Sequence, residues 1–348
     1  MQPPRSRLVR RCLGTWEHPL TRGGQLGRPT NRGWVVTLAG FGINLTLGVL
    51  YSWSIFAKEL SAEWGWSTGG ASVPYAVAVA FFALVLTFAG RAQDRYGPRL
   101  VASLGGALVG LGLLLSSMAT PQNHVPLILG FGVMTGSGIA MGFVSTFPAA
   151  AKWFPPRRRG LITGLVVSGF GIASVYIAPL TQLLLGQWGI KLTFLLLGAG
   201  FLVVTTVLAQ LLQNPPSGYL VEGATVADLS ETPAGCPPAQ REYDWHEMVR
   251  TRPFVLLWLM YGLTAFAGIM IIGHMAKITI TQTGLDLGFV LVAILAVGNA
   301  SGRIIAGIVT DRIGAVRTMT IVFTSQALVM VLIGFADSAL LLAPAAFI

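Results

Sequence analysis

The sequence predicts an all-α protein that crosses a membrane many times. Of its 348 residues 53% are hydrophobic and only 10% are charged, and the mean hydropathy of +0.70 is too high for an ordinary soluble domain. Nine apolar runs reach the roughly 20 residues that one helical span requires. A short charged motif occurs twice, with six of these runs between its copies. This period predicts two bundles of six helices, the second of them incomplete.

The N-terminal tail, residues 1–32, holds seven arginines against a single acid, Glu17, and contains no apolar run. A secretory signal peptide needs an apolar segment, so none is predicted here. The composition predicts a basic, disordered cytoplasmic tail. Contact of this tail with an anionic membrane surface is the alternative.

The first bundle is expected over residues 33–212. Lysines and arginines gather in the loops after the second and fourth helices, and the other loops hold few, so the positive-inside rule places the N-terminus in the cytoplasm. We expect an integral protein of the bacterial inner membrane. Lys58, Glu59 and Glu63 are assigned to the loop after the first helix. The six helices are predicted at about 33–57, 71–90, 100–119, 126–150, 160–185 and 190–212.

Residues 213–252 are rich in Pro, Gly and balanced charges, which predicts a cytoplasmic linker. The partial second bundle is expected over 253–348. Its helices are predicted at about 254–275, 285–308 and 318–336, and a further apolar run begins at 339. This last run is too short to span a membrane. If the second half repeats the first, most of a tenth helix and all of two more are missing, and the sequence is expected to be C-terminally truncated.

A lone arginine, Arg303, lies inside the apolar run 285–308. Ionisable side chains within membrane helices are costly and usually face a bundle interior or a water-filled cavity. Arg303 precedes Asp311 by eight residues, roughly 12 Å of helix, which places it near the middle of a roughly 30 Å membrane core. The arginine fork matches a carboxylate, so Arg303 is the first candidate for binding a small organic anion. A structural arginine, paired with backbone or with a missing helix, is the alternative.

Further basic and polar residues accompany Arg303 in the second half. Asn299 lies one turn earlier, where it can hold substrate or hydrogen-bond a neighbouring helix. His274 and Lys277 lie three residues apart near the outer end of helix 254–275, where they can attract anions, and His274 can titrate near neutral pH. The alternative is an interfacial lysine beside a hydrogen-bonded histidine. Apart from Asp286 at the end of helix 285–308, no Asp or Glu falls inside the nine predicted helices, which disfavours a cationic substrate.

Polar and aromatic residues of the first half are candidates for lining a substrate pathway. Asn44 and Tyr51 are seven residues apart and share a face of the first helix, with Trp53 near its outer end. Tyr176 lies on the fifth helix, which glycines and a proline interrupt. Aromatic walls can bury the apolar part of a small acid while their polar tips orient it. Membrane-interface anchoring is the alternative for Tyr51 and Trp53.

Several function classes are disfavoured. The arginines lie in short loops, which membrane topology explains, so nucleic-acid binding is not expected despite a net charge of +10. Cys12 and Cys236 are too few and too far apart for a disulfide framework or a metal site. The sequence contains no nucleophile paired with a base and no phosphate loop, so neither an enzyme activity nor a cofactor is expected.

The duplicated motif reads G-x-x-x-D-R-x-G, as GRAQDRYG from Gly90 and as GIVTDRIG from Gly307. Two six-helix halves joined by a linker, each with this motif after its second helix, closely resemble the major facilitator superfamily of secondary transporters. The resemblance implies the major facilitator fold and a cytoplasmic latch, in which Asp311 faces the region between the fourth and fifth helices and Asp94 faces the eleventh. The residues implied to form this latch are Gly90, Asp94, Arg95, Gly97, Arg99, Gly307, Asp311, Arg312, Gly314 and Arg317.

Several phrases resemble the oxalate/formate antiporter family and its monocarboxylate relatives. In that family the arginine that matches Arg303 is implied to bind the substrate carboxylate, with a lysine of the eleventh helix, beyond Ile348, as its partner. The phrases that carry the resemblance are GVLYSWSIFAKEL, AKWFPPRRRGLITG, NPPSGY, GHMAKI and GNASGRIIAG.

The leading hypothesis is a secondary active transporter of small organic anions, such as oxalate, formate or lactate-like monocarboxylates, that works by alternating access. Its expected partners are the anion, protons or a counter-anion, and the lipid bilayer. Three alternatives are a truncated fragment that does not transport, a membrane sensor, and a superfamily transporter of another solute.

Overall fold

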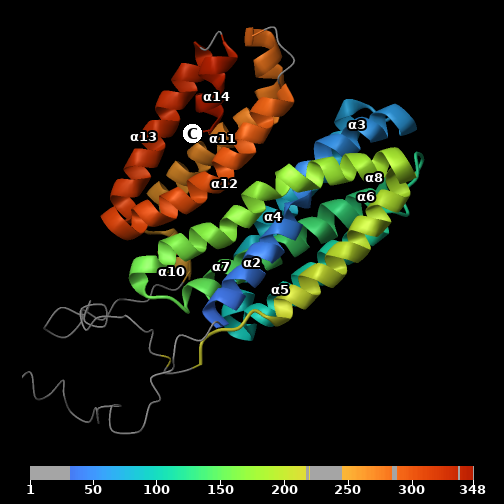
Figure 1. Cartoon of the computed structure of the whole chain (residues 1–348). Helices are drawn as coiled ribbons and strands as arrows, with labels where there is room; N and C mark the ends of the chain where they lie inside the picture. The colour runs from blue at the N-terminus through green and yellow to red at the C-terminus, as the bar shows by residue number, and fades with distance from the viewer. Residues whose placement is uncertain (1–31, 217–218, 220–244, 284–287, 336–337, 348) are drawn as a thin grey trace, which may run out of the picture. The chain divides into compact units, whose positions relative to one another are not determined.

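The computed structural model describes residues 32–216, 219, 245–283, 288–335 and 338–347, and most of these residues are helical (Figure 1). The chain divides into two units, one of Met1–Thr30 and Pro216–Met270, the other of Asn31–Pro215 and Ile271–Ile348. The predicted domain bounds at 212 and 253 stay a prediction. The helical segments up to residue 210 are α2 (Arg32–Leu47), η2 (Gly48–Ser52), α3 (Trp53–Trp64), α4 (Thr68–Tyr96), α5 (Pro98–Ser116), α6 (Val125–Leu127), η3 (Ile128–Thr135), α7 (Gly136–Ala151), η4 (Pro156–Arg158) and α8 (Arg159–Gln210).

The first predicted helix is longer than expected. It continues through η2 and α3 to Trp64, so Lys58, Glu59 and Glu63 lie on a helix and not in a loop. Phe56 and Leu60, four residues apart, are buried on one face, while Lys58 and Glu63 are exposed. The segment is therefore amphipathic, and packing of its apolar face keeps it helical.

Two predicted helices, 160–185 and 190–212, meet at a kink inside α8. Gly189, at φ 68°, bends α8 between the runs predicted at 160–185 and 190–212, because a glycine can adopt this left-handed conformation without steric cost.

The two motif aspartates lie on helices. Asp94 and Asp311 belong to the last turns of α4 and α12 (Gly288–Ile313), and not to the loops that follow. Gly97 and Gly314, which end the two motif copies, share nearly the same backbone, with φ of 85° and 86°.

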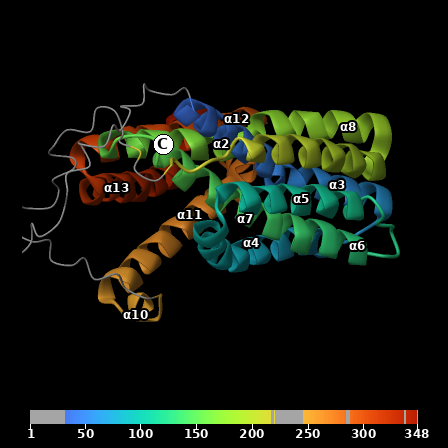
Figure 2. The ribbon, with the colours of Figure 1, turned by 90° about the horizontal axis from the view of Figure 1, so that it is seen from below.

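Helices α5 and η3–α7 contact each other through glycines at two levels. A Cβ at Gly105 would lie 2.7 Å from the Gly138 carbonyl oxygen, and one at Gly112 would lie 2.5 Å from that of Gly130. The pairs are seven residues apart on α5 but eight on its partner. The η3 segment is a π-helix, whose wider turns take up the extra residue and keep both pairs in register. Figure 2 shows α4, α5, α7 and α8 running alongside one another.

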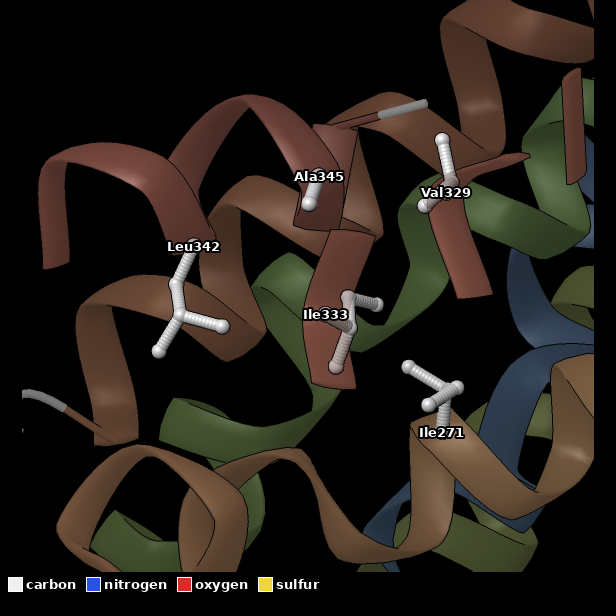
Figure 3. Packing of buried hydrophobic residues seen from close by; sticks show 5 residues of the cluster. All are labelled: Ile271, Val329, Ile333, Leu342 and Ala345. Carbon is white, nitrogen blue, oxygen red and sulfur yellow. The ribbon is translucent and has the colours of Figure 1, made fainter. Parts of the chain in front are cut away.

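The later elements follow the predicted order. Their bounds are α10 (Trp245–Val249), α11 (Arg252–Thr283), α12 (Gly288–Ile313), α13 (Ala315–Gly334) and α14 (Ala339–Phe347). In the unit of Asn31–Pro215 and Ile271–Ile348, a small apolar core forms where α13 and α14 meet Ile271 of α11 (Figure 3). Its buried members are Ile271, Val329, Ile333, Leu342 and Ala345.

Six helical stretches of the described chain are long and apolar enough to cross a membrane. The 55-residue stretch that contains α8 covers two of the predicted spans, with Gly189 between them. The six stretches are Arg32–Trp64, Gly69–Tyr96, Pro98–Ser116, Val125–Ala151, Pro156–Gln210 and Ala315–Gly334.

Candidate functional site

Arg303 lies half-buried on α12, where that helix packs against α8. Its Nη1 donates a hydrogen bond of 3.0 Å to the Val167 carbonyl oxygen on α8. Its Nε donates one of 3.1 Å to the Asn299 Oδ1, one turn earlier on the same helix. Asn299 therefore orients the guanidinium, and the carbonyl of Val167 joins it to the first half of the chain.

The surroundings of Arg303 are polar but neutral. The phenol of Tyr51, on η2, lies close to the guanidinium of Arg303. Within the described residues, the hydrogen-bond acceptors of Arg303 are a carbonyl oxygen and an amide oxygen, and no carboxylate pairs with it. A guanidinium keeps its charge in proteins, so a positive charge remains for a ligand.

Small residues bring α8 and α12 close enough for these contacts. A Cβ at Gly164 would meet the Arg303 carbonyl oxygen, and a Cβ at Gly171 would lie 2.8 Å from the Asn299 Oδ1. Glycine spacing of this kind lets two helix backbones approach closely. Figure 1 shows α8 and α12 side by side. The sequence contained this signal, since Gly160, Gly164 and Gly171 lie at helical spacing.

The aspartate of the second motif caps α8. Both Asp311 carboxylate oxygens accept hydrogen bonds, Oδ1 from the Gly160 amide and Oδ2 from the Leu161 amide, each at 2.8 Å. A carboxylate is stabilised there because a helix N-terminus carries free N–H groups and a partial positive charge. Asp311 thus reaches the region that the family resemblance implied. Its counterpart Asp94, on α4, is exposed.

Other predicted site residues are engaged elsewhere. Asn44 is fully buried and donates to the Gly40 carbonyl at 2.9 Å and to the Thr146 hydroxyl at 2.8 Å, while its Oδ1 finds no partner in the described structure. The Tyr176 hydroxyl donates to the Leu45 carbonyl at 2.9 Å, and the Trp53 indole donates to that of Ala71 at 2.9 Å. These bonds join the helices of the first half.

His274 and Lys277 lie on α11, which continues to Thr283, beyond the end predicted at 275. Their side chains lie outside the described part of the structure. Four arginines of the repeated motifs, Arg95, Arg99, Arg312 and Arg317, are exposed. Within the described ranges, no three His, Cys, Asp or Glu side chains are grouped as metal ligands would be.

Known proteins resemble the chain over most of its length. A model of the Major Facilitator Superfamily (MFS) matches residues 34–348. The uncharacterized MFS-type transporter YhjX of Escherichia coli is 28% identical over 290 residues, which are 83% of this chain and 68% of that protein. The oxalate:formate antiporter of Oxalobacter formigenes is 25% identical over 312 residues, 89% of this chain and 71% of the antiporter. Monocarboxylate transporter 11 of Mus musculus is 30% identical over 282 residues, which are 80% of this chain and 60% of that transporter.

A solved structure shares the fold. It is that of the proton:xylose symporter XylE bound to 6-bromo-6-deoxy-D-glucose, with a TM-score of 0.58 over 92% of this chain and 79% of the symporter. At 16% sequence identity this likeness concerns the fold alone. The predicted all-α major facilitator fold is confirmed. With the family model matching nearly the whole chain and with transporters among its relatives, the chain belongs to the major facilitator superfamily of membrane transporters, and not to a family of enzymes.

Proposed function

We propose that this protein is a secondary transporter of small organic anions, such as oxalate, formate or lactate-like monocarboxylates, and that Arg303 binds the substrate carboxylate. The observation that carries the proposal is the state of Arg303. It is a permanent cation on a helix of the membrane fold, and its described partners are neutral. A half-buried cation of this kind gains more from an anionic ligand than a cation already paired with an acid.

The relatives support the substrate class. Two of them are named as an oxalate:formate antiporter and a monocarboxylate transporter, and both names concern carboxylates. Of the residues predicted from the sequence, Arg303, Asn299 and Tyr51 form the core of the proposed site. Pathway roles for Asn44, Tyr176, His274 and Lys277 stay predictions.

We also propose that the bonds of Asp311 to α8 latch one end of the pathway. Alternating access requires contacts that hold in one conformation and break in the other. Two charge-assisted hydrogen bonds at a helix N-terminus fit this requirement, because they are strong when formed and both partners can be hydrated when they part. The Asp94 motif is proposed to act in the same way at the other repeat.

The proposal also covers the membrane in which the protein lies and the ion that drives transport. The charge of the loops supports a cytoplasmic N-terminus, and two of the relatives are bacterial, which supports the inner membrane of a bacterium. Either protons or a counter-anion drive the transport. Uptake that requires an anion inside the vesicle would identify an exchanger, and uptake driven by an inward proton gradient would identify a symporter.

The test is uptake of labelled oxalate, formate and lactate by proteoliposomes that contain the full-length protein. Arg303→Gln is expected to lower uptake at least tenfold at low substrate concentration, because a lost charge-assisted bidentate contact weakens anion binding by about 10- to 100-fold. Arg303→Lys keeps the charge but loses the planar fork, so partial activity is expected.

Lys191→Gln is the matched control, since it removes an exposed positive charge from α8 and is expected to leave uptake unchanged. Equal recovery of monodisperse protein for all variants excludes a folding defect. Full uptake by Arg303→Gln would overturn the site, and transport of a cation or neutral solute in place of anions would overturn the substrate class.

A further inference from the structure

Helices α2 to α8 hold two groups of aromatic side chains that differ in exposure. In the first group, the rings of Trp53 and Phe131 have centroids 4.2 Å apart, as do those of Phe56 and Phe194. Phe56, Phe131 and Phe194 are 0% exposed. This group is ordinary core, and it stabilises the bundle.

The second group forms a continuous series of ring contacts, called here the aromatic wall. Tyr51 meets Phe170 with ring centroids 5.4 Å apart, and Phe170 meets Phe143 at 5.7 Å. Phe143 in turn meets Phe147 at 5.7 Å and Phe82 at 6.1 Å. All five residues are half-buried, unlike the fully buried rings of the first group.

Helical spacing places two of these rings on one face of α7 and a third near the contact of Arg303 with α8. Phe143 and Phe147 are four residues apart on α7, and Phe170 lies three residues after Val167 on α8. Residues three and four apart lie on the same face of a helix. Because the Val167 carbonyl oxygen accepts the hydrogen bond from Arg303, Phe170 lies within one turn of the point where the guanidinium meets α8.

Tyr51 connects the aromatic wall to the cation. Its ring is the first of the series, and its phenol lies close to Arg303. A guanidinium within a membrane fold faces a protein interior or an aqueous cavity, and not the lipid. The aromatic wall therefore borders the anion site, with polar groups at one end and apolar rings at the other.

We propose that the site selects carboxylates that carry a ring-sized apolar body, with the carboxylate on Arg303 and the body against Phe170 and Phe143. This inference rests on the proposed anion-binding role of Arg303 and narrows its substrate class. Oxalate and formate have no apolar part, so the aromatic wall adds nothing to their binding. An aryl carboxylate such as benzoate would add a contact between its ring and Phe170, and aromatic pairs favour binding beyond the apolar area that they bury.

Direct binding to the purified protein in detergent tests the inference, with labelled benzoate as the probe and with acetate, formate and oxalate as competitors. Benzoate is expected to bind at least tenfold more tightly than acetate. Phe170→Leu and Phe143→Leu keep an apolar side chain but remove the ring. Each is expected to weaken benzoate binding about three- to tenfold and to leave acetate binding within twofold. Phe88→Leu is the matched control, since Phe88 lies on α4, outside the wall, and is 63% exposed.

Arg303→Gln separates the inference from the proposed function. If it abolishes binding of all four acids while the leucine variants lower the preference for benzoate, the inference is supported. If acetate or oxalate binds as tightly as benzoate, or if the leucine variants weaken all acids equally, the aromatic wall is packing and only the anion site stands. If no carboxylate binds, or if binding survives in Arg303→Gln, the proposed function itself fails.

Discussion

The guanidinium of Arg303 is held by the Asn299 amide oxygen and the Val167 carbonyl oxygen, neither of which carries a net charge. Such acceptors replace part of the water that a buried cation loses, but they do not neutralise it. Whether residue 299 carries an amide or a carboxylate therefore determines whether the protein itself neutralises the charge of Arg303. An acid there would supply the carboxylate that a substrate is expected to bring.

Asn299→Asp is expected to weaken anion binding by more than tenfold. The new carboxylate would lie about 3 Å from the Arg303 Nε and would pair with it, at a cost to ligand affinity on the order of 2–4 kcal/mol. Asn299→Ala removes the hydrogen bond without adding a charge, and a loss below tenfold is expected. The measurement is the Kd of a labelled carboxylate for both variants. Unchanged affinity in Asn299→Asp would show that the anion does not bind at Arg303.

Residue identity alone predicted part of this site. Arg303 stands out because a charge in an apolar run is rare, and Asn299 follows from helical spacing. The Val167 carbonyl could not be found in this way, because every residue has a carbonyl and the partner was set by how α8 meets α12. The hydrogen bond from the Tyr176 hydroxyl to the Leu45 carbonyl could not be predicted either, because it depends on packing between distant segments.

At the scale of the helix, periodicity and turn residues located the spans. The prediction failed where tertiary packing extends a helix, as at α3, whose buried Phe56 and Leu60 outweigh the charges beside them. It also missed the π-helical η3, because no local pattern marks an extra residue that is fixed by glycines on a partner helix. The predicted boundary between the runs 160–185 and 190–212 agrees with the structure, because the non-helical backbone of Gly189 separates two helical parts of α8.

Gly164→Ala tests the close crossing of α8 and α12. The added methyl group would overlap the Arg303 carbonyl oxygen, which is backbone and cannot rotate away. A loss of stability of about 1–3 kcal/mol is expected, together with weaker anion binding, because α12 must shift and displace the guanidinium. Gly200→Ala is the control, since a Cβ at Gly200 meets nothing within 4 Å. Thermal unfolding in detergent is measured for both, and equal midpoints would contradict the crossing.

At the scale of the molecule, the duplicated motif predicted the architecture correctly. Gly97 and Gly314 adopt nearly the same backbone conformation, so the two copies of the motif match in structure as well as in sequence. The repeat could not predict which contacts the motif makes in a given conformation, because these depend on how two halves meet. The Asp311 bonds to the Gly160 and Leu161 amides became visible only in the folded chain.

The neutral surroundings of Arg303 also have an electrical consequence. If no group besides the described neutral partners balances the charge of Arg303, the carrier without substrate moves a positive charge through the membrane field. With a monoanion bound, the net charge that moves is zero. A full elementary charge gains or loses about 2.3 kcal/mol per 100 mV. Voltage steps across a protein-loaded planar membrane are therefore expected to give transient currents without substrate, and saturating monocarboxylate is expected to suppress them. Currents that persist at saturation would mean that the charge of Arg303 is not the charge that the ligand cancels.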